Sequence, residues 1–360
     1  MGGRIIVALS GGVDSAVTAL LLKRAGHDVQ GLFMQNWEQD EAGYCTAAED
    51  FQDARRVAAE LGIALHRVDL SAQYRERVFS DFLAASRAGL TPNPDVLCNR
   101  EIKFGECLRH ARRLGGDLLA TGHYARIVQG ADGPQLHKGV DAGKDQSYFL
   151  HAVERGAFAH ALLPLGDLHK QQVRELAHEA GLPVAAKRDS TGICFIGERP
   201  FREFLGQFLP HTPGPILDVE GTQLGEHVGL PFYTLGQRGG IGIGGLRGGS
   251  GDAWYVVAKR TQDNTLVVAQ GADHPALFSG RLVAGAVNWL CASPPPLEGE
   301  LAVRLRYRQP DQPARVTLRP DGEVEIEPAE PQRAVTPGQS AVIYAGTRCL
   351  GGGVIRQTAL

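Results

Sequence analysis

The stretch that decides the fold is Ile5-Ile-Val-Ala-Leu-Ser-Gly-Gly-Val-Asp-Ser15, where an apolar run leads straight into two glycines. Residues 4–9 predict a short buried strand, and residues 16–24 predict the helix that follows it. Glycines allow a tight turn whose backbone N–H groups point into one concavity, and the start of a helix adds the positive end of its dipole. This arrangement suits a pyrophosphate group. The alternative is an ordinary turn in which Asp14 or Ser15 caps the helix.

The chain around this loop alternates between strands and helices. Residues 29–33, 64–68 and 118–122 predict further strands. Residues 47–61 have the apolar spacing of a helix. Because strands that alternate with helices indicate a parallel sheet, we expect an α/β fold with a nucleotide-binding domain over residues 1–200.

The rest of the chain has a different pattern. Glycine becomes dense in residues 235–245, and the helix signals disappear. Short alternating segments separated by turn residues follow, and they predict a small C-terminal β-barrel. The segments that predict the barrel are residues 301–307, 314–318, 323–327 and 340–344, while residues 254–258 and 265–268 alternate like strands within the middle part. We expect a small glycine-rich middle domain over residues 201–274 and the β-barrel over residues 275–360.

Composition limits the classes of protein that fit. The chain has 360 residues, of which 43% are hydrophobic and 21% are charged, and its formal net charge is −3. These values favour a folded protein of two or three domains, and they leave room for a local basic face that binds nucleic acid. The sequence contains no apolar stretch of about 18 residues, so it predicts no membrane span. The first residues lack a signal peptide, so we expect a cytoplasmic protein.

Two of the six cysteines have neighbours that suit chemistry. No Cys-x-x-Cys pair is present, so we expect no structural zinc. Cys98 follows two prolines and precedes Arg100 and Lys103, while Cys194 lies in a glycine-containing segment before Arg199. Nearby cations favour the thiolate form, and two such cysteines on loops fit sulfur transfer by thiol exchange. The alternative for each is a buried structural thiol.

The motifs also carry a family resemblance. Ser10-Gly-Gly-Val-Asp-Ser15 resembles the PP-loop of ATP pyrophosphatases, and it is not a Walker A loop because no Gly-Lys-Ser/Thr follows. Further motifs are Phe33-Met-Gln-Asn-Trp37, Asn93-Pro-Asp95, Ala120-Thr-Gly-His-Tyr-Ala-Arg126, Gly143-Lys-Asp-Gln-Ser-Tyr-Phe-Leu150, Tyr233-Thr-Leu-Gly-Gln-Arg238 and Arg306-Tyr-Arg-Gln309. In this order they are similar to the bacterial tRNA-uridine 2-sulfurtransferase family, the 2-thiouridylases of the PP-loop superfamily that act at the wobble position.

The resemblance implies a site for each step. The implied ATP contacts are Ala8, Leu9, Ser10, Gly11, Gly12, Val13, Asp14, Ser15, Met34 and Gly122. Cys194 is implied to carry a persulfide, Cys98 to be the second catalytic thiol, able to form a transient disulfide with it, and Asp95 to be the general acid or base. The implied tRNA contacts are Asn93, Pro94, Asp95, His123, Lys144, Asp145, Gln146, Arg306, Tyr307 and Gln339.

The resemblance also implies the reaction and its partners. The reaction is ATP-dependent 2-thiolation of the wobble uridine by adenylation of its C2 oxygen and transfer of persulfide sulfur. The expected substrates are the tRNAs for lysine, glutamate and glutamine, and the expected sulfur donor is a cysteine desulfurase or a relay protein. Mg²⁺ is expected to enter with ATP, and Asp14 is a candidate ligand for it.

Several simpler interpretations remain beside these. Lys144 and Asp145 also fit a solvated surface pair, and His123 also fits a core histidine. The alternating Arg304, Arg306, Arg308, Arg315 and Arg319 fit either one wet face of the barrel or a basic stripe for RNA. At the level of the whole protein, a ligase or amidotransferase with the same loop and an RNA-binding module with a degenerate nucleotide site are the two competing functions.

Overall fold

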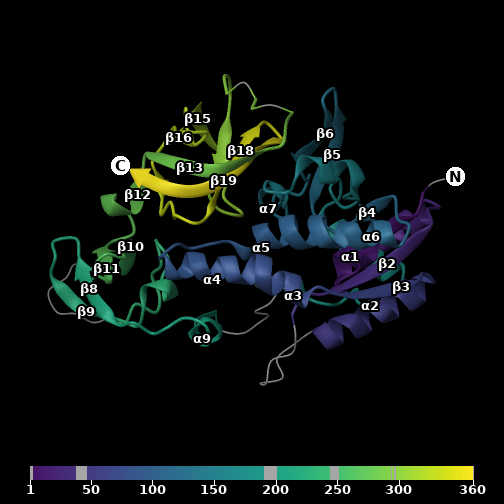
Figure 1. The fold of residues 1–360 in the computed structure, drawn as a ribbon, viewed down its shortest axis with the longest axis horizontal. Coiled ribbons are helices and arrows are strands. Elements are labelled where there is room, and N and C mark those ends of the chain that lie inside the picture. The colour runs from purple at the N-terminus through teal and green to yellow at the C-terminus, as the bar shows by residue number, and fades with distance from the viewer. Residues whose placement is uncertain are drawn as a thin grey trace.

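The computed structural model describes residues 3–37, 47–189, 201–243, 251–292, 294–295 and 297–359 (Figure 1). Its first part contains a five-stranded sheet in the order β3-β2-β1-β4-β7, and all neighbouring strands are parallel. The strands are β1 (Ile5–Ala8), β2 (Val29–Gln35), β3 (Leu65–Asp69), β4 (Leu118–Ala120) and β7 (Ala161–Leu162). The predicted parallel sheet is therefore confirmed.

Helices cover both faces of this sheet. The helices on one face are α1 (Val13–Arg24), α2 (Ala47–Leu61) and α8 (Lys170–Glu179). The opposite face is covered by the π-helical segment Cys98–Cys107 and by α6 (Leu108–Arg113). Successive strand residues point to opposite faces, and so Ile5 and Val7 pack in the first layer while Ile6 packs in the second. Because β1 has β2 on one side and β4 on the other, a crevice is expected beyond its carboxyl end.

The middle part is a four-stranded sheet that shares its core with helices of the first part. The strands, in spatial order, are β10 (Trp254–Arg260), β11 (Thr265–Gln270), β8 (Gly214–Asp218) and β9 (Gln223–His227). The helices that pack near it are α3 (Ser71–Tyr74), the π-helical turn Arg75–Phe79, α4 (Ser80–Arg87), α5 (Pro94–Leu97) and α9 (Phe201–Gly206). Tyr74, Phe82 and Cys98 lie in one apolar cluster with Ile216 and Val256. The middle sheet is thus fixed against the first part by a common core.

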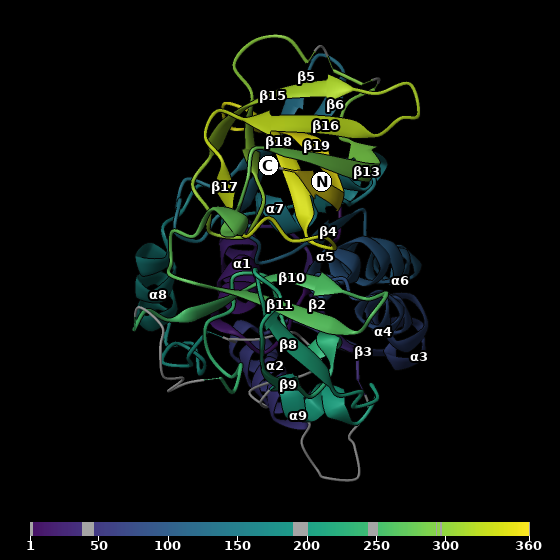
Figure 2. The same cartoon turned by 90° about the vertical axis from the view of Figure 1, so that its left-hand side faces the viewer.

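The C-terminal part is a closed six-stranded barrel, as the sequence predicts. Its strand order is β13-β16-β15-β14-β18-β19, and β13 pairs with β19 to close the ring. The strands are β13 (Arg281–Trp289), β14 (Ala302–Arg304), β15 (Gln312–Leu318), β16 (Val324–Pro328), β18 (Ser340–Ala345) and β19 (Arg348–Ala359). A short pair lies between the barrel and the middle sheet, formed by β12 (Phe278–Ser279), which is labelled in Figure 1, and β17 (Gln332–Arg333), which is labelled in Figure 2.

A hairpin from the first part extends the barrel sheet, and the sequence analysis did not predict it. The hairpin strands are β5 (Ala125–Gly130) and β6 (Gly133–Lys138), and β6 pairs with β19 at His137 and Arg348. Two ion pairs reinforce this joint, one between Lys138 and Asp311 and one between Arg304 and Asp145. The short helix α7 (Ser147–Leu150) packs beneath it.

The five alternating arginines do not share one face, so neither sequence interpretation of them holds as a group. Arg304 is 9% exposed and is paired with acidic side chains. The strand β14 ends there, and Arg308 has a positive φ of 66°, which breaks the alternation that the sequence suggested. Arg319 is paired with Glu325. Within the described residues, no helix is long and apolar enough to cross a membrane.

Candidate active site

The glycine loop lies at the carboxyl end of β1, in the crevice that the sheet topology predicts. Gly11 has a φ of +80°, and a Cβ on it would lie 2.2 Å from the carbonyl oxygen of Asp50 on α2. Only glycine fits such a turn without strain. Gly12 precedes α1 and supplies no side-chain cap, so the first N–H groups of α1 remain available to an anion.

Short contacts hold the loop in shape. The Ser10 N–H donates to Ser15 Oγ at 3.1 Å, and the Ser15 hydroxyl donates to the Gly12 carbonyl at 3.1 Å. Beyond the end of β4, a Cβ on Gly122 would lie 3.0 Å from Ser15 N. Met34, near the end of β2, is partly buried on the other side of β1. The residues predicted to frame a nucleotide therefore come together on three adjacent strands.

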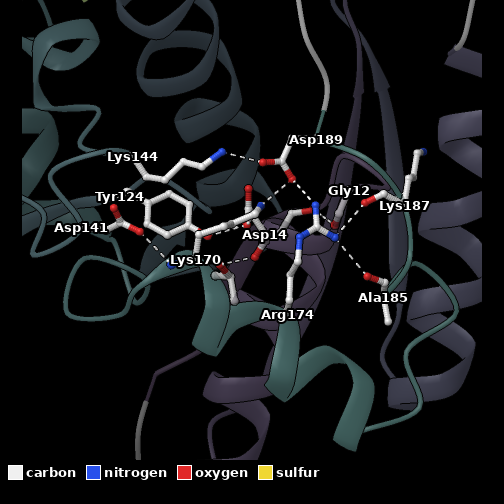
Figure 3. Close-up of polar contacts among 12 residues, drawn as sticks. Gly12, Asp14, Tyr124, Asp141, Lys144, Lys170, Arg174, Ala185, Lys187 and Asp189 are labelled. Carbon is white, nitrogen blue, oxygen red and sulfur yellow. Dashed lines mark hydrogen bonds and ion pairs between the residues drawn. The ribbon is translucent and has the colours of Figure 1, made fainter. Parts of the chain in front are cut away.

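Asp14 is the centre of a polar network beside the loop (Figure 3). Its Oδ1 accepts hydrogen bonds from the Tyr124 hydroxyl and the Lys170 ammonium, both at 2.7 Å. Among the described residues its Oδ2 has no hydrogen-bond partner, and the side chain is 34% exposed. This carboxylate oxygen suits Mg²⁺, which binds carboxylate and phosphate oxygens, and the N–H groups at the start of α1 suit the phosphates.

Asp189 collects three cations in the same network. Its carboxylate contacts Lys144 at 2.7 Å, Lys170 at 2.8 Å and Arg174 at 2.6 Å. Burial alone raises the pKa of Asp189, but the hydrogen bonds from Lys144 and Lys170 outweigh it and lower the pKa to about 2. Lys170 thereby joins Asp189 to Asp14. These contacts fix the position of Asp189, which precedes Cys194 in the sequence.

Lys187 ties the same stretch of chain to the base of the loop. Its ammonium contacts Asp50 at 2.7 Å and Asp53 at 2.6 Å, and it donates to the Gly11 carbonyl at 3.2 Å. Burial lowers the pKa of Lys187, but the hydrogen bonds to the two carboxylates outweigh this effect and raise it. Cys194, the predicted persulfide carrier, lies outside the described residues, so its position and its pairing with Cys98 stay predictions.

The Asp95 segment begins a helix where the sequence analysis expected a loop. Asn93 caps α5 by accepting a hydrogen bond from the Asp95 N–H at 3.1 Å, and Pro94 occupies the first turn. Both residue types favour a helix start. Consequently Cys98 lies on a continuous helix and is 1% exposed. Asn99 is 3% exposed and donates to the Asp95 carbonyl at 2.9 Å.

Comparison with known proteins places this geometry in a family. The model for the tRNA methyl transferase HUP domain matches residues 3–198, that for the tRNA methyl transferase PRC-barrel domain matches 202–270, and that for the aminomethyltransferase beta-barrel domain matches 279–355. The tRNA-specific 2-thiouridylase MnmA of Cupriavidus metallidurans is 54% identical over 99% of both chains. That of Acidovorax ebreus is 54% identical over 98% of both chains. The chain belongs to the tRNA-specific 2-thiouridylase family.

Solved structures give a weaker likeness. A 4-thiouridine synthetase in complex with RNA and bound ATP shares 20% sequence identity, covers 57% of this chain and 50% of that chain, and aligns with a TM-score of 0.35. This similarity is too low to bear on the function of the 2-thiouridylase site. The membership therefore rests on the full-length relatives and on the family models.

Several residues that the 2-thiouridylase resemblance assigns to tRNA have partners within the protein. Asp145 is 3% exposed and pairs with Arg304. Lys144 pairs with Asp189, so the two neighbours do not form the solvated pair considered above. Gln146 accepts the Tyr124 N–H at 3.1 Å. Direct contacts of these residues with RNA stay predictions.

His123 fits the interpretation of a satisfied core histidine. It is 7% exposed, and its Nδ1 lies 2.7 Å from the Thr121 hydroxyl oxygen. Burial, followed by the charge of Lys103, holds the pKa of His123 well below its ordinary value. The imidazole is therefore neutral near pH 7.

The remaining predicted contacts lie on the barrel side. Tyr307 packs against Phe149 with ring centroids 4.4 Å apart. The Gln339 side chain donates to the Thr91 carbonyl at 2.7 Å, which places it beside the segment that leads to Asp95. Arg306 donates to three neutral acceptors, among them the Leu235 carbonyl at 3.2 Å. The barrel and the Asp95 segment thus meet, as the assignment of both to one substrate requires.

Sequence reasoning missed the two cations on α8. Lys170 and Arg174 lie four residues apart on an ordinary amphipathic helix, and nothing in the sequence distinguishes them from surface residues. Their role follows only from the approach of α8 to α1, which brings Lys170 to Asp14.

Proposed function

We propose that the protein is an ATP-dependent tRNA-uridine 2-sulfurtransferase that thiolates C2 of the wobble uridine. The observation that carries the proposal is the glycine loop with Asp14 at the end of β1, in a chain that matches a named 2-thiouridylase over 99% of both lengths. The substrates proposed are the tRNAs for lysine, glutamate and glutamine, with a desulfurase or relay protein as sulfur donor. The proposed location is the cytoplasm, and the proposed domains are residues 1–200, 201–274 and 275–360.

The proposed first step is adenylation of the base. The uridine must leave the base stack to reach the loop. Its C2 oxygen attacks the α-phosphate of ATP, and pyrophosphate departs. The N–H groups at the start of α1 would stabilise the charge that develops on the phosphates. Mg²⁺ bound with ATP would neutralise phosphate charge, and Asp14 Oδ2 would hold it.

The proposed second step transfers sulfur. The terminal sulfur of the Cys194 persulfide attacks C2, and AMP departs with the former C2 oxygen. The Cys98 thiolate then attacks Cys194 Sγ, so that the sulfur stays on C2 and a Cys98–Cys194 disulfide forms, which cellular thiols later reduce. Asp95 would move the protons. The buried Asn99 Oδ1 has no hydrogen-bond partner among the described residues, and it would suit the N3–H of a uracil beside Asp95.

The decisive experiment is single-turnover thiolation. Purified protein is mixed with unmodified tRNA, ATP, Mg²⁺, a cysteine desulfurase and cysteine, and nucleosides are analysed by mass spectrometry. The expected product is a wobble uridine in which one oxygen is replaced by sulfur. Cys98→Ser and Cys194→Ser are expected to abolish it. Cleavage of ATP without any thiolated nucleoside would contradict the proposal and would favour the ligase or amidotransferase alternative.

Matched variants test the individual roles. Cys349→Ser is the control thiol, because Cys349 lies on β19 of the barrel, outside the Cys98 and Cys194 motifs, and burial raises its pKa to about 12. Asp95→Asn is expected to lower the single-turnover rate by about 100-fold or more, with little change in tRNA affinity. Near-normal turnover in that variant would refute the proton-transfer role.

A further inference from the structure

Three cations that have no acidic partner among the described residues gather at the junction of the middle sheet and the barrel. Most basic side chains of the barrel have an acidic partner, as Arg319 has in Glu325 at 2.6 Å. Lys259 on β10, Arg306 after β14 and Arg333 on β17 have no carboxylate within ion-pair distance in the part of the chain that the structure describes. We call these three residues the junction cluster.

The three side chains of the junction cluster converge on one short segment, residues 233–236. The Lys259 ammonium donates to the Tyr233 carbonyl at 3.0 Å, and Arg306 Nη2 donates to the Leu235 carbonyl at 3.2 Å. A Cβ on Gly236 would lie 3.5 Å from Arg333 Nη1 and 3.9 Å from Arg306 Nη2. The two guanidinium groups therefore reach nearly the same point.

The protein itself supplies little compensation for this charge. Burial, and then the charge of Arg333, lower the pKa of Arg306. Burial lowers the pKa of Lys259 to about 8. Both shifts mean that the cationic forms are disfavoured where they stand. An anion that bound among the three side chains would relieve the repulsion and complete their hydrogen bonding.

The position of the junction cluster indicates which anion. Lys259 Nζ also lies 3.4 Å from the Thr91 hydroxyl, and Thr91 begins the segment that contains Asn93 and Asp95. The barrel holds the same residue, because the Thr91 N–H donates to the Pro337 carbonyl at 3.0 Å. Arg333 is exposed and lies over the ring of Tyr255, with 4.9 Å from Cζ to the ring centroid. The cluster thus borders the proposed target-base site and has at least one side chain open to solvent.

We propose that Lys259 and Arg333, together with Arg306, bind phosphate groups of the tRNA backbone next to the target nucleotide. This inference rests on the proposed function, since it takes tRNA as the substrate. Phosphodiester oxygens match the fork of N–H donors on arginine, and a lysine ammonium provides a point charge for the neighbouring phosphate. The family resemblance assigned Arg306 to RNA, whereas Lys259 and Arg333 follow from the geometry alone.

The test is the salt dependence of tRNA binding. Binding of fluorescently labelled tRNA is measured by anisotropy from about 50 to 200 mM KCl for the wild-type protein, Lys259→Gln and Arg333→Gln. Each lost phosphate contact is expected to reduce the slope of log K against log [salt] by about 0.7 to 0.9. At about 0.1 M salt, this corresponds to roughly 5- to 8-fold weaker binding per variant.

Matched variants separate specific contacts from general charge effects. Arg319→Gln changes the net charge equally, and it leaves Glu325 paired with Arg281, so its slope is expected to equal that of the wild type. Arg333→Lys and Lys259→Arg keep a cation and are expected to restore most of the slope. If Lys259→Gln does not fold, as judged by its melting temperature, the exposed Arg333 decides the question.

The outcomes distinguish this inference from the proposed function. A wild-type protein that neither binds nor thiolates tRNA would overturn the proposed function. A wild-type protein that does both, with unchanged slopes in Arg333→Gln and Lys259→Gln, would overturn the junction cluster alone. An equal loss in Arg319→Gln would also overturn it, because net charge and not position would then explain the effect.

Discussion

Replacement of Asp145 by Asn tests whether this residue stabilises the fold or binds RNA. Its carboxylate accepts the N–H groups of Gly139 and Ser147, both at 3.1 Å, and the Ser147 hydroxyl at 3.0 Å, in addition to its ion pair with Arg304. All of these bonds are buried or partly buried at the joint between the first part and the barrel. We therefore expect a large loss of stability and only a small direct effect on tRNA affinity.

The expected loss of unfolding free energy in Asp145→Asn depends on the acidic partner that Arg304 keeps. Removing one partner of a buried pair typically costs about 3–5 kcal/mol. Arg304 keeps the carboxylate of Asp311 at 2.7 Å in the variant, so we expect the low end, about 3 kcal/mol of unfolding free energy. Asp311→Asn is the matched control. Its carboxylate is 36% exposed, and the expected loss is about 1 kcal/mol.

The assay is urea denaturation followed by tryptophan fluorescence, with tRNA affinity measured in parallel under folding conditions. Trp254 packs against the core of the middle sheet and Trp289 against that of the barrel. The fluorescence therefore reports on the unfolding of both parts. A loss below about 1 kcal/mol in Asp145→Asn, together with a tRNA affinity reduced by more than about tenfold, would refute the structural argument.

Three further predictions concern the loop and its network. Tyr124→Phe removes the donor to Asp14 and is expected to weaken ATP binding by about 10-fold, which calorimetry would show; unchanged affinity would mean that the bond forms only without ATP. Gly11→Ala places a Cβ on the Asp50 carbonyl at a positive φ and should abolish ATP binding; a normal dissociation constant would show that the loop can rearrange. Asp189→Asn should lose about 1–2 kcal/mol of stability at pH 7. Because the pKa of Asp189 is lowered to about 2, that difference should persist down to about pH 4, shrink at lower pH and vanish only below about pH 2, and a difference that is constant with pH would contradict the assignment.

The elements predicted correctly from sequence are those with local signals. Ala47–Leu61 has the bounds that its apolar spacing predicts, and the helix after the glycine loop ends before Gly26, which has a φ of +82°. The hairpin partner of β19 escaped prediction because His137 and Arg348 are far apart in the chain, and no local pattern encodes such a pairing. The burial of Arg304 was not predicted for the same reason, because its acidic partner Asp145 comes from another part of the chain.

The helix at Cys98 was not predicted, although its starting residues carry a local signal for it. Two prolines before the cysteine suggested a rigid loop, yet Pro94 is the first residue of α5 and Asn93 is its cap. Proline at the first helical position costs no hydrogen bond, because that N–H has no partner within the helix. The same residues that exclude a helix before position 94 therefore promote one after it.

The two acidic residues at the proposed chemical steps are positioned by different parts of the protein. Asp14 is held within the first part by Tyr124 and Lys170. The segment leading to Asp95 is held at Thr91 by the middle sheet and by the barrel. An RNA bound at the junction cluster, which contacts Thr91 through Lys259, would therefore lie beside the segment that positions Asp95.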